Sequence, residues 1–335
     1  MGRFRHLSAD EVRALLMAFA APAYVEHHGL SAGTVNTNVR VETVDGPRFM
    51  RVNEGKSQED VAREAAIIAH VAARGVSSPL PLRTPAGEPF AVSLHSGAIV
   101  SLFPWVAGRT LRRAEVLPRH AYEVGQALAI LHRTSDDFTD RRPGRYEPDE
   151  IDRRYARLQT ATATGDRSID QELAASLAVL GPELAALRRD RSPNLPVGLI
   201  HGDLFIDNVL WSEDDSTFRA LLDFEQASWG HLAYDLAVTT LAWCFGRDDF
   251  RVDVTTALLA GYAEKRPPTR EEWRSFVPEL RFAACRFAVT RITDVHQRAG
   301  LGAPPGKDYR RYLLRLQRIH QHASDGTFGP PQSRR

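Results

Sequence analysis

The stretch from Leu199 to Asp235 constrains this chain more than any other part of its sequence. Four polar residues stand in it at fixed spacing, in the pattern H-G-D-x-x-x-x-N followed by a more distant acid: His201, Asp203, Asn208 and Asp223. Two short apolar runs, 209–211 and 218–222, separate the Asn from the last acid and have the composition of β-strands. The pattern predicts a polar loop, followed by a hairpin whose second strand ends at a carboxylate.

This spacing suits the transfer of a phosphoryl group from a nucleotide. Such a transfer needs a carboxylate that orients and deprotonates an acceptor hydroxyl, and a Mg²⁺ ion held by hard oxygen ligands. Asp203 is the candidate base, and Asn208 and Asp223 are the candidate Mg²⁺ ligands. His201 is expected to organise the loop. An H-x-D alone often occurs by chance at a turn, but the Asn at the fifth following position and the later Asp favour the catalytic interpretation.

The phrases HGDLFIDNVLW, LLDFEQA and AYDLAV resemble the aminoglycoside phosphotransferase and choline kinase superfamily, and within it the bacterial homoserine kinases of that fold. Phe205 and Asp207 strengthen the second likeness, and Asp207 is expected to contact the substrate. Weaker likeness extends to VGQALAILH, AWCF and RFAVTR, so the resemblance covers most of the chain. The sequence departs at Asp223-Phe224-Glu225, where protein kinases have D-F-G and homoserine kinases often have Tyr in the third position.

The resemblance implies a two-lobed α+β fold of the protein-kinase type. A small β-rich lobe with one helix should occupy residues 1–104, a larger and mainly helical catalytic lobe residues 105–325, and a disordered tail residues 326–335. The resemblance also implies ATP as the phosphoryl donor, Mg²⁺ as the metal, and an acceptor bound by the larger lobe. The likeness to the homoserine kinases in particular implies conversion of L-homoserine to O-phospho-L-homoserine in threonine biosynthesis.

The amino-terminal part of the chain predicts two helices with a hairpin between them. An S-x-x-E capping box beginning at Ser8 predicts a helix over about residues 9–20. The runs 35–44 and 48–52 are rich in strand-forming residues and predict a hairpin. Capping residues and apolar spacing predict the second helix over 57–75.

Several residues of this lobe are candidates for nucleotide binding. Gly33 and Thr34 lie in a turn where backbone N–H groups could approach phosphates, although a plain turn fits the sequence equally well. Arg51 on the hairpin and Glu64 on the second helix are the candidates for a cation and acid that hold the α- and β-phosphates, with Arg in place of the usual Lys. A solvated surface pair is the alternative, and Lys56 is a weaker candidate for the cation.

Further residues are candidates for binding the acceptor. Asn36 and Asn38 match an Asn-rich phrase of the homoserine kinases. The phrase RFAVTR offers Arg286 and Arg291 to the α-carboxylate of an amino acid, because a guanidinium binds a carboxylate through two hydrogen bonds. Structural ion pairing within helices is the competing interpretation. Asp235 is expected to hold the backbone of the catalytic loop rather than to touch the substrate.

The remaining patterns complete a kinase-like order of elements. Residues 98–103 read as a buried strand, and 104–108 read as the link between the lobes. Residues 118–133 carry an apolar stripe at helical spacing, and 149–191 are rich in helix-forming residues. The charged segment 136–146 contains Pro and Gly and predicts an exposed loop.

Composition disfavours several other classes of protein. With 335 residues, 43% of them apolar and 25% charged, the chain is typical of a globular protein of two lobes. Its net charge of +1 gives no field to attract nucleic acid or a membrane. No apolar run approaches the roughly 20 residues of a membrane span, and the first residues lack the apolar core of a signal peptide. Cys244 and Cys285 indicate buried thiols in a cytoplasmic protein, without a zinc site.

The sequence therefore predicts an ATP-dependent kinase that acts on a small hydroxylated amino acid or amino alcohol. One alternative is a related kinase that acts on an aminoglycoside, choline, ethanolamine or a sugar. An aminoglycoside site should be rich in acids, yet the dense acidic run 212–216 falls in a predicted hairpin turn. The other alternative is a catalytically weak nucleotide-binding protein, which the presence of both Asp203 and Asp223 disfavours.

Overall fold

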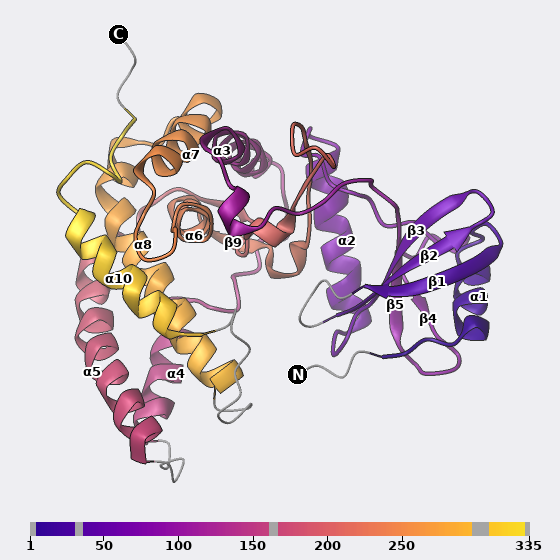
Figure 1. The fold of residues 1–335 in the computed structure, drawn as a ribbon, viewed down its shortest axis with the longest axis horizontal. Helices are drawn as coiled ribbons and strands as arrows, with labels where there is room; N and C mark the ends of the chain where they lie inside the picture. Colours follow the sequence, from indigo (N-terminus) through magenta and orange to yellow (C-terminus); the bar gives the residue numbers. More distant parts are fainter. Residues whose placement is uncertain (1–4, 31–35, 161–166, 297–307, 332–335) are drawn as a thin grey trace. The chain divides into compact units, whose positions relative to one another are not determined.

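The computed structural model of the chain describes residues 5–30, 36–160, 167–296 and 308–331 (Figure 1). The chain divides into two compact units: Met1–Arg109 with Leu210–Glu225, and Thr110–Val209 with Gln226–Arg335. The predicted lobes were continuous in sequence, whereas here the segment 210–225 returns to the first unit. It does so because Arg109 and Trp211 exchange two backbone hydrogen bonds of 2.9 Å each.

An antiparallel sheet forms the centre of the first unit. Its described strands stand in the order β1, β2, β3, β5, β4, with bounds Tyr24–Leu30, Thr37–Thr43, Gly46–Val52, Ile99–Pro104 and Ala91–Val92. The β2–β3 hairpin and β5 confirm the strands predicted from the sequence. Along β2 every second residue is buried, as expected for a strand with one face on a core. Gly46 closes the hairpin with φ +102°, a conformation that favours glycine.

Helix α1 (Ala9–Ala18) covers one face of this sheet. Val12 and Leu16 lie in the same apolar core as Val41 and Met50 of the sheet. The N-cap was predicted correctly, since the Ser8 side chain accepts a hydrogen bond from the Glu11 backbone. The Glu11 carboxylate, however, does not return to the cap: it is buried and accepts a hydrogen bond of 2.6 Å from Ser96.

Helix α2 (Gln58–Ala72) is the second helix of this unit, whereas the resemblance implied a single helix. Ser57 and Asp60 form a complete capping box at its start. The chain leaves it through Gly75, which has φ +90°. One face of α2 is buried and includes Val61, Ile68 and, unusually for a carboxylate, Glu64.

The second unit is mainly helical. Its long described helices are α3 (Pro118–Arg133), α4 (Pro148–Thr160), α5 (Arg167–Asp190), α6 (Leu232–Trp243), α7 (Val252–Lys265), α8 (Arg270–Arg291) and α10 (Arg310–His322). A small antiparallel pair, β6 (Val197–Ile200) with β9 (Ser228–His231), supports the loop that carries the H-G-D pattern.

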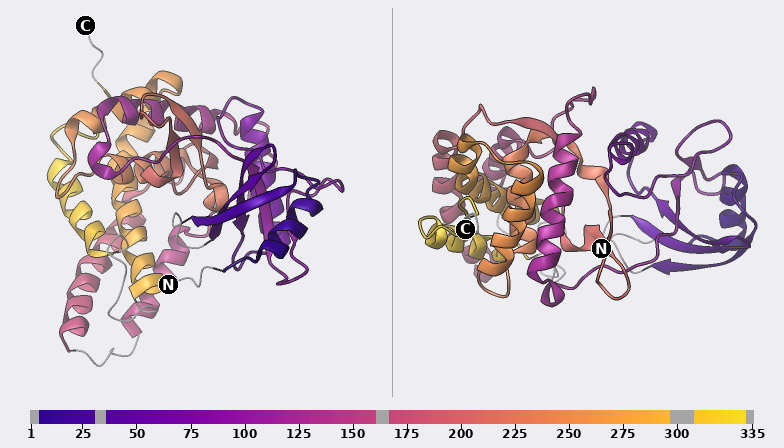
Figure 2. Two further views of the ribbon diagram at one scale, coloured as in Figure 1. Left: turned by 45° about the vertical axis from the view of Figure 1, so that its right-hand side comes forward. Right: turned by 90° about the horizontal axis from the view of Figure 1, so that it is seen from above.

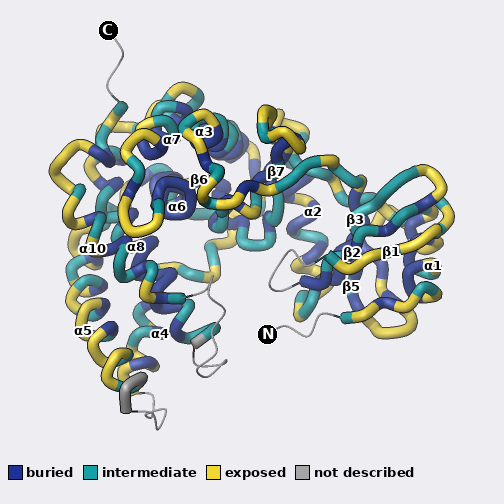
Figure 3. The backbone as a smooth tube through the Cα atoms, in the orientation of Figure 1, coloured by how far each residue is buried: buried dark blue, intermediate teal, exposed yellow. Residues whose placement is uncertain are grey.

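Helix α6 lies at the centre of this unit and is apolar on nearly all sides. Most of its residues are buried, as the dark blue tube in Figure 3 shows. Helices α3 and α7 pack side by side in Figures 1 and 2. Their contact runs through glycines, because a Cβ on Gly125 would lie 2.2 Å from the Leu258 carbonyl oxygen. Side chains larger than hydrogen do not fit there.

The segment after α10 differs from the predicted disordered tail. Phe328 is 3% exposed, and its ring lies 4.9 Å from that of Phe250. A single aromatic residue thus anchors residues that Gly and Pro composition had marked as frayed. Within the described ranges, no helix is both long and apolar enough to cross a lipid bilayer.

Candidate active site

The loop that follows β6 carries the first three polar residues of the pattern. His201 is fully buried, and Asp203 is partly exposed. Between them Gly202 has φ +76°, and a Cβ there would lie 2.9 Å from the Gln226 carbonyl oxygen. A glycine is therefore required at this turn. The short 3₁₀ helix η2 (Ile206–Asn208) then leads into β7 (Val209–Trp211).

Asp235, in the first turn of α6, fixes the backbone of this loop. Its carboxylate accepts hydrogen bonds of 2.7 Å from the His201 N–H and 2.8 Å from the Gly202 N–H. The predicted role of Asp235 is confirmed. Burial raises the pKa of this carboxyl, but the hydrogen bond from His132, the neighbouring His201 and the Gly202 N–H outweigh burial, and the pKa is lowered. Asp235 is therefore an ionised, fully buried anchor.

A chain of buried groups stands behind this anchor. His132 Nε2 donates to Asp235 at 3.0 Å, and its Nδ1 accepts from the Tyr262 hydroxyl at 2.7 Å. Burial lowers the pKa of His132, so this imidazole is neutral. Arg266 donates both to the Tyr262 oxygen at 3.0 Å and to Glu272 at 2.8 Å. The catalytic loop is thus connected through α3 and α7 to the start of α8.

Asn208 is oriented for binding a cation through its oxygen. Its side-chain nitrogen donates to the Asp203 carbonyl oxygen at 2.8 Å. Because only the NH₂ end of an amide can donate to a carbonyl, the Oδ1 end is the one left for a ligand. Trp243 of α6 adds a further restraint by donating to the Leu204 carbonyl at 3.1 Å.

Asp223 belongs to the first unit and follows β8 (Phe218–Leu221). It has φ +62°, which is uncommon for a residue with a Cβ. Such a conformation costs about 1–3 kcal/mol and is concentrated at functional sites. The next residue, Phe224, is 1% exposed and begins the 3₁₀ helix η3 (Phe224–Gln226). The buried ring fixes the position of the strained acid beside it.

Arg51 and Glu64 form a buried pair rather than a solvated surface pair. Two guanidinium nitrogens of Arg51 donate to the two Glu64 oxygens at 3.0 and 2.6 Å, and Nε donates to Asn53 at 2.9 Å. Burial alone would lower the pKa of Arg51, but Glu64, with Asp223 and Glu225, raises it. The predicted cation and acid are therefore brought together, near the acid of the Asp-Phe-Glu phrase.

The two asparagines of the Asn-rich phrase lie close to residues of the same unit, near Arg51 and Glu225. Asn36 donates to Glu225 at 3.1 Å, and Lys56 lies 3.1 Å from the same carboxylate. Asn38 lies on β2, opposite Arg51 in the sheet. The structure does not describe residues 31–35, so the predicted phosphate-binding residues Gly33 and Thr34 lie outside the described residues.

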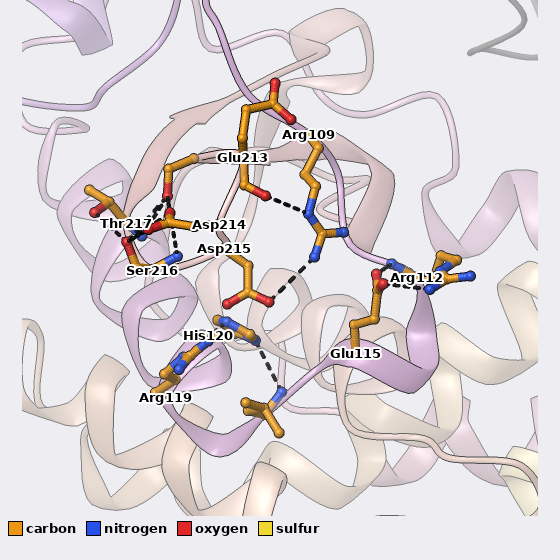
Figure 4. A network of polar contacts seen from close by, with 12 residues as sticks. Arg109, Arg112, Glu115, Arg119, His120, Glu213, Asp214, Asp215, Ser216 and Thr217 are labelled. Carbon is orange, nitrogen blue, oxygen red and sulfur yellow. Dashed lines mark hydrogen bonds and ion pairs between the residues drawn. The ribbon is translucent and has the colours of Figure 1, made fainter.

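The hairpin turn between β7 and β8 holds the acidic run. Asp214 is held by the Ser212 and Ser216 hydroxyls, which lower its pKa to about 2. In the upper part of Figure 4, Arg109 reaches the Glu213 carbonyl at 3.2 Å and the Asp215 carboxylate at 3.3 Å. Glu213 and Asp214 are exposed, so the acidic run is a solvated hairpin turn, as the sequence analysis expected.

A cavity of about 550 Å³ opens in the second unit beside the catalytic loop. Gly202, Gln226, Ser228 and Tyr234 contribute to its wall. Arg286 of α8 also lines it and is 4% exposed. The cavity therefore joins the turn that precedes Asp203 to a buried guanidinium.

Two aromatic rings contact the guanidinium of Arg286. Its Cζ lies 4.0 Å from the ring centroid of Tyr146 and 3.9 Å from that of Phe287. Within the described residues its buried Nε has no hydrogen-bond partner, and no carboxylate lies within ion-pairing distance. A buried cation held by rings but without an anion is suited to binding an anionic ligand group.

The other arginines of this region have different surroundings. Arg291 donates to the Asp308 carbonyl at 3.2 Å, lies over the Tyr312 ring, and does not line the cavity. Arg281 pairs with Glu183 and Asp190. Asp207 is exposed on η2. The structure thus brings Arg286 to the cavity and leaves Arg291 outside it.

Sequence reasoning missed two contributors to this region. Tyr146 had been included in an exposed loop, although an aromatic residue at the end of a charged segment was a signal that it packs. His132 ends the phrase VGQALAILH, but only the apolar residues of that phrase had been used. Its partner Asp235 lies 103 residues away, so local spacing could not reveal the pair.

Comparisons with known proteins agree with this geometry. The model of the phosphotransferase enzyme family matches residues 26–274. A protein named homoserine kinase from Chelativorans sp. (strain BNC1) is 31% identical and covers 98% of this chain and 99% of its own. Another of that name, from Methylobacterium radiotolerans (strain ATCC 27329 / DSM 1819 / JCM 2831 / NBRC 15690 / NCIMB 10815 / 0-1), is 32% identical over 99% of this chain and 100% of its own.

Solved structures show the same fold at lower identity. A microcompartment-associated aminopropanol kinase has a TM-score of 0.69 and 16% identity, covering 96% of this chain and 99% of that one. An aminoglycoside phosphotransferase from Alicyclobacillus acidocaldarius subsp. acidocaldarius DSM 446 has a TM-score of 0.67 and 16% identity, covering 96% of both chains. The resemblance and the kinase-like fold predicted from the sequence are confirmed, and the chain belongs to the phosphotransferase enzyme family.

Proposed function

We propose that this chain transfers the γ-phosphoryl group of ATP to the γ-hydroxyl of L-homoserine, forming O-phospho-L-homoserine and ADP. The observation that carries the proposal is Arg286, a buried guanidinium without a carboxylate partner among the described residues, in a cavity beside the catalytic loop. An amino-acid acceptor supplies the missing anion as its α-carboxylate. The likeness to proteins named homoserine kinase over nearly the whole chain supports the same acceptor.

The reaction assigns roles to the residues of the catalytic loop. Asp203 accepts the proton of the acceptor hydroxyl as the oxygen bonds to the γ-phosphorus and the bond to the β-phosphate oxygen breaks. Asp235 acts through the backbone, by holding the His201 and Gly202 peptide groups. His201 is buried behind the loop and organises it rather than touching the acceptor.

Asn208 and Asp223 are assigned to a divalent cation of the magnesium type on the chemistry of their side-chain oxygens. Both are hard ligands, and the amide of Asn208 already has its nitrogen engaged at the Asp203 carbonyl. When bound, Mg²⁺ neutralises the charge that develops on the nucleotide phosphates. Arg51, supported by Glu64, is assigned to the phosphates as a second source of positive charge.

Other acceptors fit the cavity less well. An aminoglycoside is a polycation, and burying it beside the unpaired guanidinium of Arg286 would place like charges together. Choline and ethanolamine lack the carboxylate that this guanidinium requires. A catalytically weak nucleotide-binding protein would not need Asp203, Asn208 and Asp223 together.

Substitution of Arg286 tests the proposal. Removing one partner of a buried charged pair costs about 2–5 kcal/mol, so Arg286→Ala should lower kcat/KM for homoserine by roughly tens to thousands of fold. KM for ATP should change little. Arg291→Ala is the matched control, because this residue lies on the same helix and does not line the cavity. Equal losses in both variants, or none in Arg286→Ala, would contradict the assignment.

A further inference from the structure

The cavity of the second unit contains an acid that the proposed function leaves without a role. Glu147 lines it and directly follows Tyr146, whose ring contacts Arg286. The carbonyl of Glu147 starts helix α4, since it accepts from the Glu150 and Ile151 N–H groups. The side chain of Glu147 takes no part in these backbone hydrogen bonds. It turns back over Gly144, where a Cβ would lie 3.5 Å from Glu147 Oε1 and 3.0 Å from the Ser228 hydroxyl.

Most other charges of the cavity are already paired. Arg191 donates to the buried Glu279 at 2.9 and 2.8 Å, and Arg188 donates to Asp152 at 2.8 Å. Glu147 makes no ion pair within the described residues. The cation Arg286 and the anion Glu147 therefore line the same cavity without neutralising each other.

The surroundings of the Glu147 carboxylate make its lack of a cationic partner costly. The residue as a whole is exposed, but the walls of the cavity desolvate its carboxylate, and this desolvation raises the pKa of Glu147. The Gly144 N–H, Arg191 and His231 act in the opposite direction, but their effect on the pKa is smaller. A ligand cation would relieve that desolvation. Asp149 and Arg145 also line the cavity and, like Glu147, are exposed. Asp149 lies in the first turn of α4, where an acid complements the helix dipole.

We propose that Glu147 is the carboxylate that recognises the α-ammonium group of the acceptor, while Arg286 recognises its α-carboxylate. This inference rests on the proposed function and deepens it. Arg286 and Glu147 lie more than an ion-pair distance apart in one cavity, so a zwitterion can bind between them. Together they select an α-amino acid over an alcohol that carries only one of the two charges, and Glu147 is a specificity-determining residue.

Acceptors that each lack one charge test the inference. L-Homoserine carries both groups, 4-hydroxybutyrate lacks the ammonium, and 3-aminopropan-1-ol lacks the carboxylate. Glu147→Gln should lower kcat/KM for homoserine by at least about tenfold, as expected for a lost hydrogen bond to a charged group. The value for 4-hydroxybutyrate should change less than about threefold, so the preference of the wild type for homoserine over this analogue collapses. Arg286→Ala should instead remove the preference for homoserine over 3-aminopropan-1-ol.

The ratio of two acceptors on one variant separates recognition from a folding defect, which would lower both values together. Asp149→Asn removes a neighbouring carboxylate and should keep the wild-type ratio. Normal turnover by the wild type with an unchanged ratio in Glu147→Gln, or a collapsed ratio in Asp149→Asn, overturns the role of Glu147 and leaves the proposed function intact. Absence of turnover of homoserine by the wild type overturns the proposed function and the inference with it.

Discussion

The buried chain His132, Asp235 and Tyr262 has one consistent set of protonation states. Arg266 donates to the Tyr262 oxygen, so the Tyr262 proton points to His132 Nδ1, and the proton of the neutral imidazole lies on Nε2, toward Asp235. Burial raises the pKa of Tyr262 and lowers that of His132, which keeps both groups neutral at pH 7. Of the groups His132, Asp235 and Tyr262, the Asp235 carboxylate is the charged one, and it contacts the catalytic loop directly.

These states predict how stability depends on pH. The folded-state pKa of His132 is lowered below its unfolded value of about 6.5, so the unfolded chain binds the proton first on acidification. The contribution of His132 is therefore complete above about pH 6.5 and is lost as pH falls through the folded-state pKa. We expect this group to account for part of the loss in unfolding free energy between pH 7 and pH 5.

The comparison is between wild type and His132→Gln in urea unfolding at the two pH values. The variant has no titrating group at this position, so its stability should decline less on acidification, even if it is less stable at pH 7. His6→Gln, at an exposed histidine, serves as the control and should follow the wild type. A decline in His132→Gln as steep as that of the wild type would show that this imidazole is not held neutral.

For individual residues, the sequence predicted the features that depend on local spacing. The five-residue step from Asp203 to Asn208 fixes both on one loop, and the capping residues of α2 act locally. It did not separate Arg286 from Arg291, because which of them reaches the cavity depends on how α8 packs. For the same reason Glu147, which has no motif, was not recognised.

Among the elements, α3 and α7 pack backbone against backbone. A Cβ on Gly261 of α7 would lie 2.0 Å from the Tyr122 carbonyl oxygen of α3, and Gly125 of α3 meets Leu258 in the reciprocal way. The atoms in the way belong to the backbone, which cannot move without shifting a helix. Helix α3 carries His132 and α7 carries Tyr262. The close contact of the two helices therefore also sets the distance between these side chains, which support Asp235 behind the catalytic loop.

The change in unfolding free energy caused by Gly261→Ala shows which of two opposing effects is larger. Helix propensity alone would stabilise the protein by about 1 kcal/mol. Overpacking against a fixed carbonyl costs about 1–3 kcal/mol or more, so we expect net destabilisation. Gly329→Ala is a control in the same unit, because the nearest atom to a Cβ there lies at an ordinary 3.4 Å, and it should change the free energy of unfolding by less than about 0.5 kcal/mol. A Gly261→Ala variant as stable as the wild type would contradict the close packing.

The elements predicted from apolar spacing were largely found, since periodicity and capping are local properties. Strand β1 was not predicted, because its sequence YVEHHGL has no clear alternation and it is mostly exposed. The tail was misjudged for the converse reason: one buried ring, Phe328, anchors a segment of otherwise polar composition.

For the whole molecule, the sequence did not predict how the chain divides into its two units. The segment 210–225 returns to the first unit through backbone hydrogen bonds at Arg109, which leave no mark in side-chain composition. As a consequence Asp203 and Asn208 belong to one unit and Asp223 to the other. The family and its fold were predicted correctly, because the H-G-D-x-x-x-x-N pattern depends on the chemistry of the reaction more than on the path of the chain.

We propose that this chain phosphorylates homoserine with Asp203 as the base. The direct measurement is the formation of O-phospho-L-homoserine from L-homoserine and Mg-ATP, followed by ³¹P NMR, with wild type and Asp203→Asn compared at equal ATP saturation. We predict that the wild type forms the product and that Asp203→Asn binds ATP normally but turns over about two to four orders of magnitude more slowly. Absence of O-phospho-L-homoserine with the wild type would contradict the proposed acceptor, and turnover by Asp203→Asn within a few fold of the wild type would contradict the role of Asp203 as the base.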